Sequence, residues 1–414
     1  MRLPFFPHSL RFLLIIPLVF LGAGSLAQDP AVPEPGGVNS TTNGKLPLWK
    51  GKWGSLVKIP IFLEAPTTMV EAYPLPSPMT RWSFPESAIP QLPAFFTSIG
   101  LPQSLVAALS QSSAQMIEDG YIHLFTPATE VAGLDSETRA KLYIELGKYE
   151  INEFHHDPVR ILTDTVEEWY RSSNLRSEIV ETIAKWSYRK GDLIAFSDLP
   201  LLLNLVSNET EAREIYKRVT RTRGYLVKLY ITDNQEWDLV RNYWSNGGQT
   251  FRLMSLEPIV NSIQELPEPM HLDISHLIPS LPRKLIYTYP GSSYAIRGTL
   301  PDCHWTSLNF FNSEPHPYLL DSRLSTNRVL EDYTPVEPPY NYGDILFYIR
   351  NDDGNAYHSC VYLADDLVFT KNGRNALVPW MISSLDDVSR IYFSNFPGHI
   401  QAYRKKDNYA GCIE

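Results

Sequence analysis

The chain has 414 residues, with 36 lysines and arginines against 46 aspartates and glutamates, so its formal net charge is -10. Hydrophobic residues make up 43% and aromatic residues 12%, which is enough apolar material for large buried cores. The acidic balance argues against a nucleic-acid partner, because nucleic acids select basic surfaces. The length exceeds that of one typical domain, so we expect more than one.

The N-terminus has the layout of a secretory signal peptide. Two arginines, Arg2 and Arg11, precede an apolar run over 12–23, and small residues before Gln28 provide a cleavage site. A membrane anchor is the alternative, but a spanning helix needs ~20 apolar residues, and this run is shorter and contains Pro17. We therefore expect residues 1–27 to be removed, the mature protein to be secreted or periplasmic, and no stable membrane anchor to remain after cleavage.

Three segments of different composition follow. Residues 28–49 are rich in proline, glycine and small polar residues, which indicates a flexible linker. Residues 50–100 are aromatic but proline-dense, so we expect an irregular covering segment. Residues 101–279 contain several amphipathic runs with polar starts and predict a mainly helical domain, with one β-branched run, 224–232, as a strand. No period repeats cleanly there, so no solenoid is expected.

Beyond a boundary near residue 280 the pattern changes to short β-rich runs. Four of them are bounded by Gly, Asp, Asn and Pro and are expected as strands, at 283–290, 342–350, 356–373 and 388–396. Between the first two lies a helix-like segment that begins at Cys303. One helix leading into a strand meander predicts an α+β domain over 280–414.

Cys303 is expected in the first turn of that helix, with Asp302 as its N-cap. The positive end of a helix favours thiolate over thiol, so this is a suitable place for a nucleophile. The alternative is a buried apolar side chain, because free cysteines are among the most often buried residues. The other cysteines are Cys360 and Cys412, and an odd count in an oxidising compartment leaves at least one thiol unpaired within the chain. Cys360 could pair with either of the other two.

A nucleophilic thiol also needs a base. His358 opens the run "HSCVYLADDLVF", and its imidazole is expected to lean over the packed helix and meet the thiol. The alternative is a half-buried structural histidine. His304 is adjacent to Cys303, but neighbours on a helix point about 100° apart, so His304 should not face the thiol. No CxxC or HExxH pattern occurs, so neither a metal nor another cofactor is expected.

These residues carry a resemblance to a known family. "YAIRGTLPDCHWTSLNFF" at 294–311, followed by "YGDILFYIRNDDGNAYHSCVYLADDLVF" at 342–369, resembles the NlpC-type cell-wall peptidases, which have a papain-like fold. By this resemblance Cys303 is the nucleophile, His358 is the base, and Tyr294 lines the site near the oxyanion. The resemblance covers the last domain only, and it implies peptide stems of peptidoglycan as the substrate.

The third catalytic residue is where the chain departs from the family. The family's position falls by register at Thr370, a weak partner for an imidazole, which we place with Tyr294 and Asp302 among the substrate-binding residues. Asn372 shares the strand face of Thr370. Its amide oxygen is expected to accept from Nδ1–H of His358, as asparagine does in papain-like triads. A two-residue turn at 365–366 would instead put Lys371 on the His358 face.

Two functions follow from these patterns. The first is a secreted cysteine peptidase or amidase that uses Cys303, His358 and Asn372 to cleave an amide bond in a peptide or in peptidoglycan. The second is a non-catalytic secreted binding or structural protein that retains a papain-like shell while its helical part does the work. The weak third residue and the bulky "DCHW", where the family has "DCSG", favour the second function. The ordered set of a tyrosine, an Asp-Cys at a helix start and a histidine at a strand start favours the first, because packing alone does not call for it, and the hydrolase is therefore the function we expect.

Overall fold

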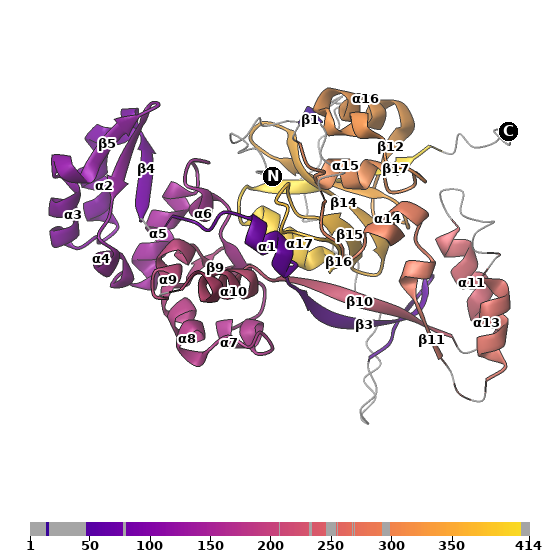
Figure 1. Cartoon of the computed structure of the whole chain (residues 1–414). Helices are drawn as coiled ribbons and strands as arrows, with labels where there is room; N and C mark the ends of the chain where they lie inside the picture. Colours follow the sequence, from indigo (N-terminus) through magenta and orange to yellow (C-terminus); the bar gives the residue numbers. More distant parts are fainter. Residues whose placement is uncertain are drawn as a thin grey trace. The chain divides into compact units, whose positions relative to one another are not determined.

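The computed structural model describes residues 14–15, 47–77, 80–206, 208–231, 234–245, 254, 256–266, 268, 270–291 and 299–406. The chain forms two compact units (Figure 1): unit 1 comprises residues 1–63 and 222–414, and unit 2 comprises residues 64–221. Apart from 14–15 and 47–49, the predicted signal peptide and linker lie outside the described residues.

In the part of unit 1 that the structure describes, the strands form two antiparallel sheets. The larger has the strand order β12-β17-β13-β14-β15-β16, with β1 paired to β14, and the smaller has the order β11-β10-β3-β2. The strands are β1 (Leu14–Ile15), β2 (Trp49–Gly51), β3 (Gly54–Leu63), β10 (Thr222–Ile231), β11 (Met270–Asp273), β12 (Tyr333–Val336), β13 (Ile345–Arg350), β14 (Asn355–Ala364), β15 (Leu367–Lys371), β16 (Trp380–Ser384) and β17 (Gly398–Lys405). The α-helices are α11 (Asn234–Trp244), α13 (Glu257–Gln264), α14 (Ser280–Leu285), α15 (Cys303–Leu308), α16 (Ser322–Asp332) and α17 (Leu385–Phe393).

The central strands of the larger sheet are buried on both faces. Side chains alternate along a strand, so successive residues enter different cores. Phe347 and Val361 belong to a core that also holds residues of α15, whereas Tyr348 and Cys360 belong to a core that also holds residues of α17. The sheet therefore separates the surroundings of α15 from those of α17.

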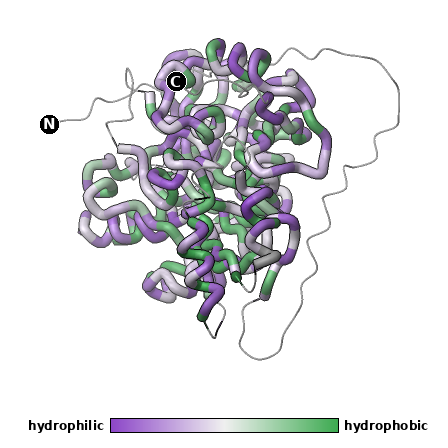
Figure 2. Tube along the Cα trace, turned by 90° about the vertical axis from the view of Figure 1, so that its right-hand side faces the viewer, coloured by the Kyte–Doolittle hydropathy of each residue, from purple (hydrophilic) through white to green (hydrophobic). Residues whose placement is uncertain are grey.

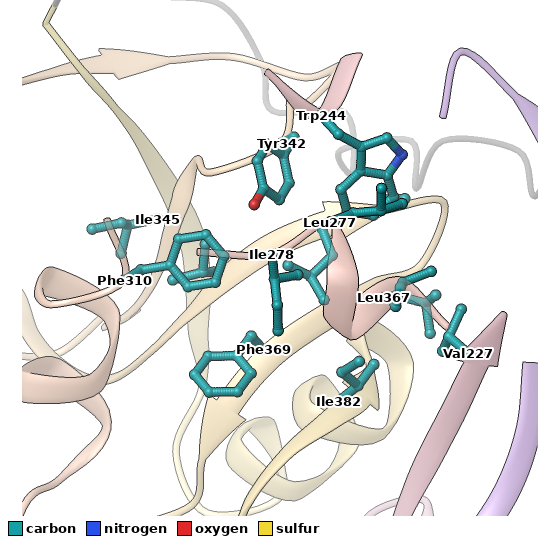
Figure 3. Close-up of a cluster of buried hydrophobic side chains, with 14 of the residues drawn as sticks. Val227, Trp244, Leu277, Ile278, Phe310, Tyr342, Ile345, Leu367, Phe369 and Ile382 are labelled. Atoms are coloured by element: carbon teal, nitrogen blue, oxygen red, sulfur yellow. The ribbon is translucent and has the colours of Figure 1, made fainter. Parts of the chain in front are cut away.

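The larger core joins the two sheets of unit 1 (Figure 3). Val227 of β10 and Trp244 of α11 pack in the same buried cluster as Phe369 and Ile382 of the larger sheet. The boundary expected near residue 280 therefore does not separate two structures, because side chains from both sides of it share one core.

Unit 2 is an insertion in unit 1. The chain leaves unit 1 after Leu63 of β3 and returns at Thr222 of β10, and these two residues are ladder partners. Unit 2 has two three-stranded sheets, ordered β4-β6-β5 and β7-β9-β8. Its strands are β4 (Arg81–Pro85), β5 (Gln115–Glu118), β6 (Tyr121–Phe125), β7 (Val159–Ile161), β8 (Tyr188–Lys190) and β9 (Leu193–Phe196). Its α-helices are α1 (Thr67–Ala72), α2 (Leu92–Ser98), α3 (Gln103–Leu109), α4 (Ala128–Ala132), α5 (Ser136–Leu146), α6 (Glu153–His156), α7 (Val166–Tyr170), α8 (Ser177–Trp186), α9 (Leu199–Leu203) and α10 (Glu209–Val219).

The mixed helix-and-strand class is as predicted, but several elements differ. The segment 50–100 is not an irregular layer, because it holds β3 and β4 and the helices α1 and α2. The segment 101–279 holds strands β5 to β11 in addition to its helices. The run 388–396, expected as a strand, lies largely in α17, which Ser384 caps by accepting from the amide of Asp387. The run 283–290 begins inside α14, and α16 was not anticipated.

Hydrophobic and hydrophilic residues succeed one another along the helices and strands (Figure 2), as expected of elements that bury one face. Within the described part of the chain, no helix combines the length and the hydropathy needed to cross a membrane.

Candidate functional site

Cys303 is the first residue of α15, and Asp302 is the N-cap, as predicted. The carboxylate of Asp302 accepts from the backbone amide of Trp305 at 2.9 Å. The same carboxylate accepts from Arg374, with 2.9 Å to Nη2 and 3.2 Å to Nε. Cys303 is only 5% exposed. The start of α15 is therefore held by a cap and an ion pair, and the thiol is enclosed there.

Polar side chains of α15 fix the helix against β14. Nδ1 of His304 lies 3.0 Å from Oγ of Ser359, and that hydroxyl donates to Oγ of Ser307 at 3.1 Å. The ring of His304 also stacks on Phe347 of β13. His304 thus points to the sheet and not to the thiol, as its place on the helix predicted.

His358 lies on the other face of the sheet. Its ladder partner on β13 is Tyr348, and its imidazole stacks on Tyr392 of α17, with 3.8 Å between ring centroids. The expectation that His358 meets the thiol of Cys303 is therefore wrong. The reason is strand alternation. The side chain of Ser359 points to the face that α15 covers, so the side chains of its neighbours His358 and Cys360 point to the face that α17 covers.

The predicted third residues are divided between the two faces. Oγ1 of Thr370 lies 3.3 Å from Nε2 of His358, so the register placed Thr370 correctly. Asn372 was expected to contact the imidazole but does not. Its Oδ1 accepts from Thr370 at 3.2 Å, and Nδ1 of His358 has no hydrogen-bond partner among the described residues.

Lys371 points away from His358, although the turn at 365–366 has two residues. A shift of register between Tyr362 and Ala364 makes Val361 the partner of Phe369, where an unshifted ladder would pair Val361 with Thr370. One bulge therefore exchanges the faces of Thr370 and Lys371. A bulge of this kind leaves no mark in the alternation of apolar residues.

Lys371 is a buried cation that the sequence did not lead us to expect in the polar cluster around Asp302 and Cys303. It is fully buried, and its Nζ donates to the carbonyls of Gly373 at 2.8 Å and Asn375 at 3.0 Å. Burial lowers the pKa of Lys371 to about 8, although the negative charge of Asp302 acts in the opposite direction. The sequence signal was its place at the end of the run of β15, two residues before Gly373.

The thiol of Cys303 is held in its protonated form. Burial, followed by the negative charge of Asp302, raises the pKa of Cys303 to about 12. The backbone amides of Ser359 and His304 and the charge of Arg374 favour the thiolate, but they do not offset burial. The predicted activation by the helix N-terminus is therefore outweighed, since desolvation penalises the charged form.

Of the remaining predicted cysteines and tyrosine, the structure describes Cys360 alone. Cys360 is a free, fully buried thiol on the His358 face, and burial raises its pKa well above the usual value. Cys303 is also free. Tyr294 and Cys412 lie outside the described residues. Across the described residues, no three histidine, cysteine or acidic side chains gather in a way that could hold a metal ion.

No family model, curated protein or solved structure matches this chain. The resemblance to the NlpC-type peptidases therefore depends on the residues alone. Chemically, the cluster at the start of α15 offers a protonated thiol, a carboxylate neutralised by arginine, and a buried lysine. A thiol–imidazole pair on one face, which nucleophilic catalysis by cysteine requires, is not formed by Cys303 and His358.

Proposed function

We propose that this chain is a non-catalytic binding or structural protein that retains a papain-like shell. The observation that carries the proposal is that Cys303 begins the helix on one face of the larger sheet, whereas His358 lies on the opposite face, against α17. An activated cysteine needs a base within hydrogen-bond reach or a lowered pKa, and here the pKa of Cys303 is raised to about 12. Both supports for nucleophilic attack are therefore missing from the described site.

The polar residues near Cys303 support a structural role for the same reason. Asp302 caps α15 and pairs with Arg374, while Ser359 links β14 to His304 and Ser307. Buried polar groups are stabilising when their partners are present. Under this proposal the landmarks shared with the peptidases are retained because they hold α15 on the sheet.

The N-terminal pattern adds a location to the proposal. A basic start, a short apolar run and small residues before Gln28 are the layout of a cleaved signal peptide. The protein would then act outside the cytoplasm, where binding to a cell-wall or extracellular component requires no catalytic group.

A cysteine hydrolase that cleaves amide bonds in peptides or in peptidoglycan stems is the second candidate. The contact between Thr370 and Nε2 of His358 favours it, because this is the register at which the family carries its third catalytic residue. This candidate requires the imidazole to leave Tyr392 and reach the other face of the sheet.

Alkylation of the mature protein by iodoacetamide distinguishes the two candidates. Variants that keep one cysteine at a time, with serine at the other two positions, assign the reactive thiol. Under the proposal, Cys303 reacts more slowly than a free thiol near pH 7, and its rate rises only at alkaline pH. Rapid alkylation of Cys303 near pH 7 that is slowed by His358→Ala would instead establish the hydrolase.

A further inference from the structure

Unit 2 contains one motif twice. The order strand, two helices, two-strand hairpin, two helices occurs from β4 to α5 and again from β7 to α10. In both copies the first strand pairs with the last strand of the hairpin, giving the sheet orders β4-β6-β5 and β7-β9-β8. Each hairpin turns through a glycine with positive φ, Gly120 at 79° and Gly191 at 59°. The topology, the pairing and the turn are therefore all shared.

The buried positions of the helices also correspond. Leu142, Tyr143 and Leu146 of α5 match Ile215, Tyr216 and Val219 of α10 at one constant offset. Leu92 and Phe96 of α2 match Val166 and Tyr170 of α7, and Leu105 and Leu109 of α3 match Ile179 and Ile183 of α8. Both final helices begin with a side chain that accepts from the N3 amide, Asp135 in α5 and Asn208 in α10. The sequence hides this repeat because the identities changed while the burial was kept.

The two copies stack through a defined interface. Helix α5 of the first copy covers the start of β8 in the second: Ser136 donates to the carbonyl of Ser187 at 2.9 Å, and the rings of Tyr143 and Tyr188 lie 5.4 Å apart in an edge contact. Tyr143 also donates to Asp198 at 2.6 Å. As a result Tyr188 is only 2% exposed, although it lies on an edge strand.

The other end of the stack is closed by a short helix. Arg213 of α10 donates to the carbonyls of Val70 at 2.7 Å and Tyr73 at 2.9 Å, so α1 lies against the helix that corresponds to α5. Repeat arrays need such a cap at each end where the stacking surface would otherwise be left open.

The first copy has no such cover on its own edge strand. Its row Ser83–His123–Met116 corresponds to the row Arg160–Ala195–Tyr188, because the two hairpin turns have equal length. Met116 is 40% exposed where Tyr188 is 2% exposed. The next residue, Ile117, is 57% exposed but points to the opposite face of the sheet, in one row with Ile122 and with Phe84, which packs on Phe96 of α2. An exposed apolar edge strand invites association.

We propose that the face of β5 that carries Met116 is a docking surface for an amphipathic helix of a partner protein. The strand β5 corresponds to β8 of the second copy. In the stacking interface within unit 2, β8 is covered by helix α5 and is not extended by another strand. The occupant therefore has the chemistry of α5, with a small hydroxyl near its N-terminus and an aromatic ring two turns later. This surface gives the proposed binding protein its contact, and the inference remains testable if Cys303 proves catalytic.

A synthetic peptide of residues 134–149, which carries the α5 sequence, is the probe. Fluorescence anisotropy of the labelled peptide with the full chain should give saturable binding, weakened at least about tenfold by Met116→Lys, because this substitution buries a charge in the contact. Ile117→Lys, on the opposite face of the same strand, and Leu205→Lys, at an exposed leucine elsewhere in unit 2, should leave the affinity unchanged. A peptide with Tyr143→Ala should bind at least about tenfold more weakly.

Two outcomes overturn the proposal. One is the absence of saturable binding, or binding that Met116→Lys leaves unchanged while circular dichroism shows this variant folded. The other is concentration-dependent self-association in sedimentation that Met116→Lys abolishes, which would assign the edge to a second copy of this chain.

Discussion

His358 stacks on Tyr392 with 11° between the ring planes and 3.8 Å between the centroids, and both side chains lie on the face of the larger sheet that α17 covers. Tyr348, the ladder partner of His358, hydrogen-bonds to Ser389 of the same helix. The imidazole is therefore part of the seam that attaches α17 to the sheet. Burial lowers the pKa of His358 well below its usual value, with a smaller contribution from His304, so the stacked ring is neutral near pH 7.

The buried neutral imidazole predicts a stability that decreases in acid. In the unfolded chain a histidine takes up a proton as the pH falls through ~6.5, whereas folded His358 does not, so folding loses up to ~1.4 kcal/mol per pH unit below that value. The variant His358→Phe keeps a ring on Tyr392 but cannot titrate. Between pH 7 and pH 5.5, its loss of unfolding free energy in urea should be about 1 kcal/mol smaller than that of the natural chain. His304 is present in both proteins, so the difference isolates His358.

Thr370 supplies the polar partner of that imidazole. Replacing it by valine keeps the shape but leaves Nε2 of a fully buried histidine without its hydrogen bond, which costs about 1–3 kcal/mol. Thr370→Ser keeps the hydroxyl and should cost less than half as much. Urea unfolding at pH 7 measures both variants, and a larger loss for the serine variant than for the valine variant would indicate that methyl packing, not the hydrogen bond, stabilises this contact.

The start of α15 could be predicted because it follows from a local rule. Thr370 was placed by the register of the family resemblance, because the bulge that sets its face leaves no mark in the alternation of apolar residues. Asp302 before an apolar stripe is a capping pattern, and alternation fixes the strand faces once the register is known. The face of His358 could not be predicted in the same way. A strand buried on both faces has apolar residues at successive positions, so the residues around Ser359 do not indicate which side meets α15.

Other features depend on contacts that are distant in the sequence. The shared core of Val227 and Phe369 removes the boundary near residue 280, although the composition changes there. The run at 388–396 is rich in β-formers, but Val388 and Ile391 lie three residues apart and bury one side of α17. In unit 2 the repeat is visible only in burial and topology, since Arg139 in α5 corresponds to Ala212 in α10.

Asp302 can be tested as the charge that opposes ionisation of Cys303. Asparagine at this position keeps the N-cap but removes the negative charge that, after burial, contributes most to the raised pKa of the thiol. We expect Asp302→Asn to lower that pKa and to increase the alkylation rate at pH 9 severalfold, because each unit of pKa changes the thiolate fraction about tenfold. The comparison is made with serine at positions 360 and 412, and a slower reaction in the variant would contradict this account.

Gly343 tests a backbone requirement in the turn before β13. Its φ is +89°, and a Cβ at this position would overlap the ring of Phe311. Gly343→Ala should therefore destabilise the chain by about 1–3 kcal/mol or more, through strain and displacement of the ring. Gly373→Ala is the matched control, since φ is +78° there and a Cβ would meet nothing within 4 Å. A smaller loss at 343 than at 373, measured in urea, would mean that Phe311 moves aside freely.

The insertion of unit 2 between paired residues predicts how the chain can be divided. Leu63 and Thr222 are ladder partners, so an Asn-Gly turn can replace residues 64–221 and close β3 and β10 as a hairpin. This shortened chain should unfold cooperatively in urea, because the core that joins Leu56, Val227 and Phe369 is intact. A fragment of residues 280–414 loses two of those three side chains together with Trp244 of the same core, and it should show no cooperative transition in tryptophan fluorescence. If the fragment unfolds cooperatively and the shortened chain does not, the division near residue 280 is the correct one.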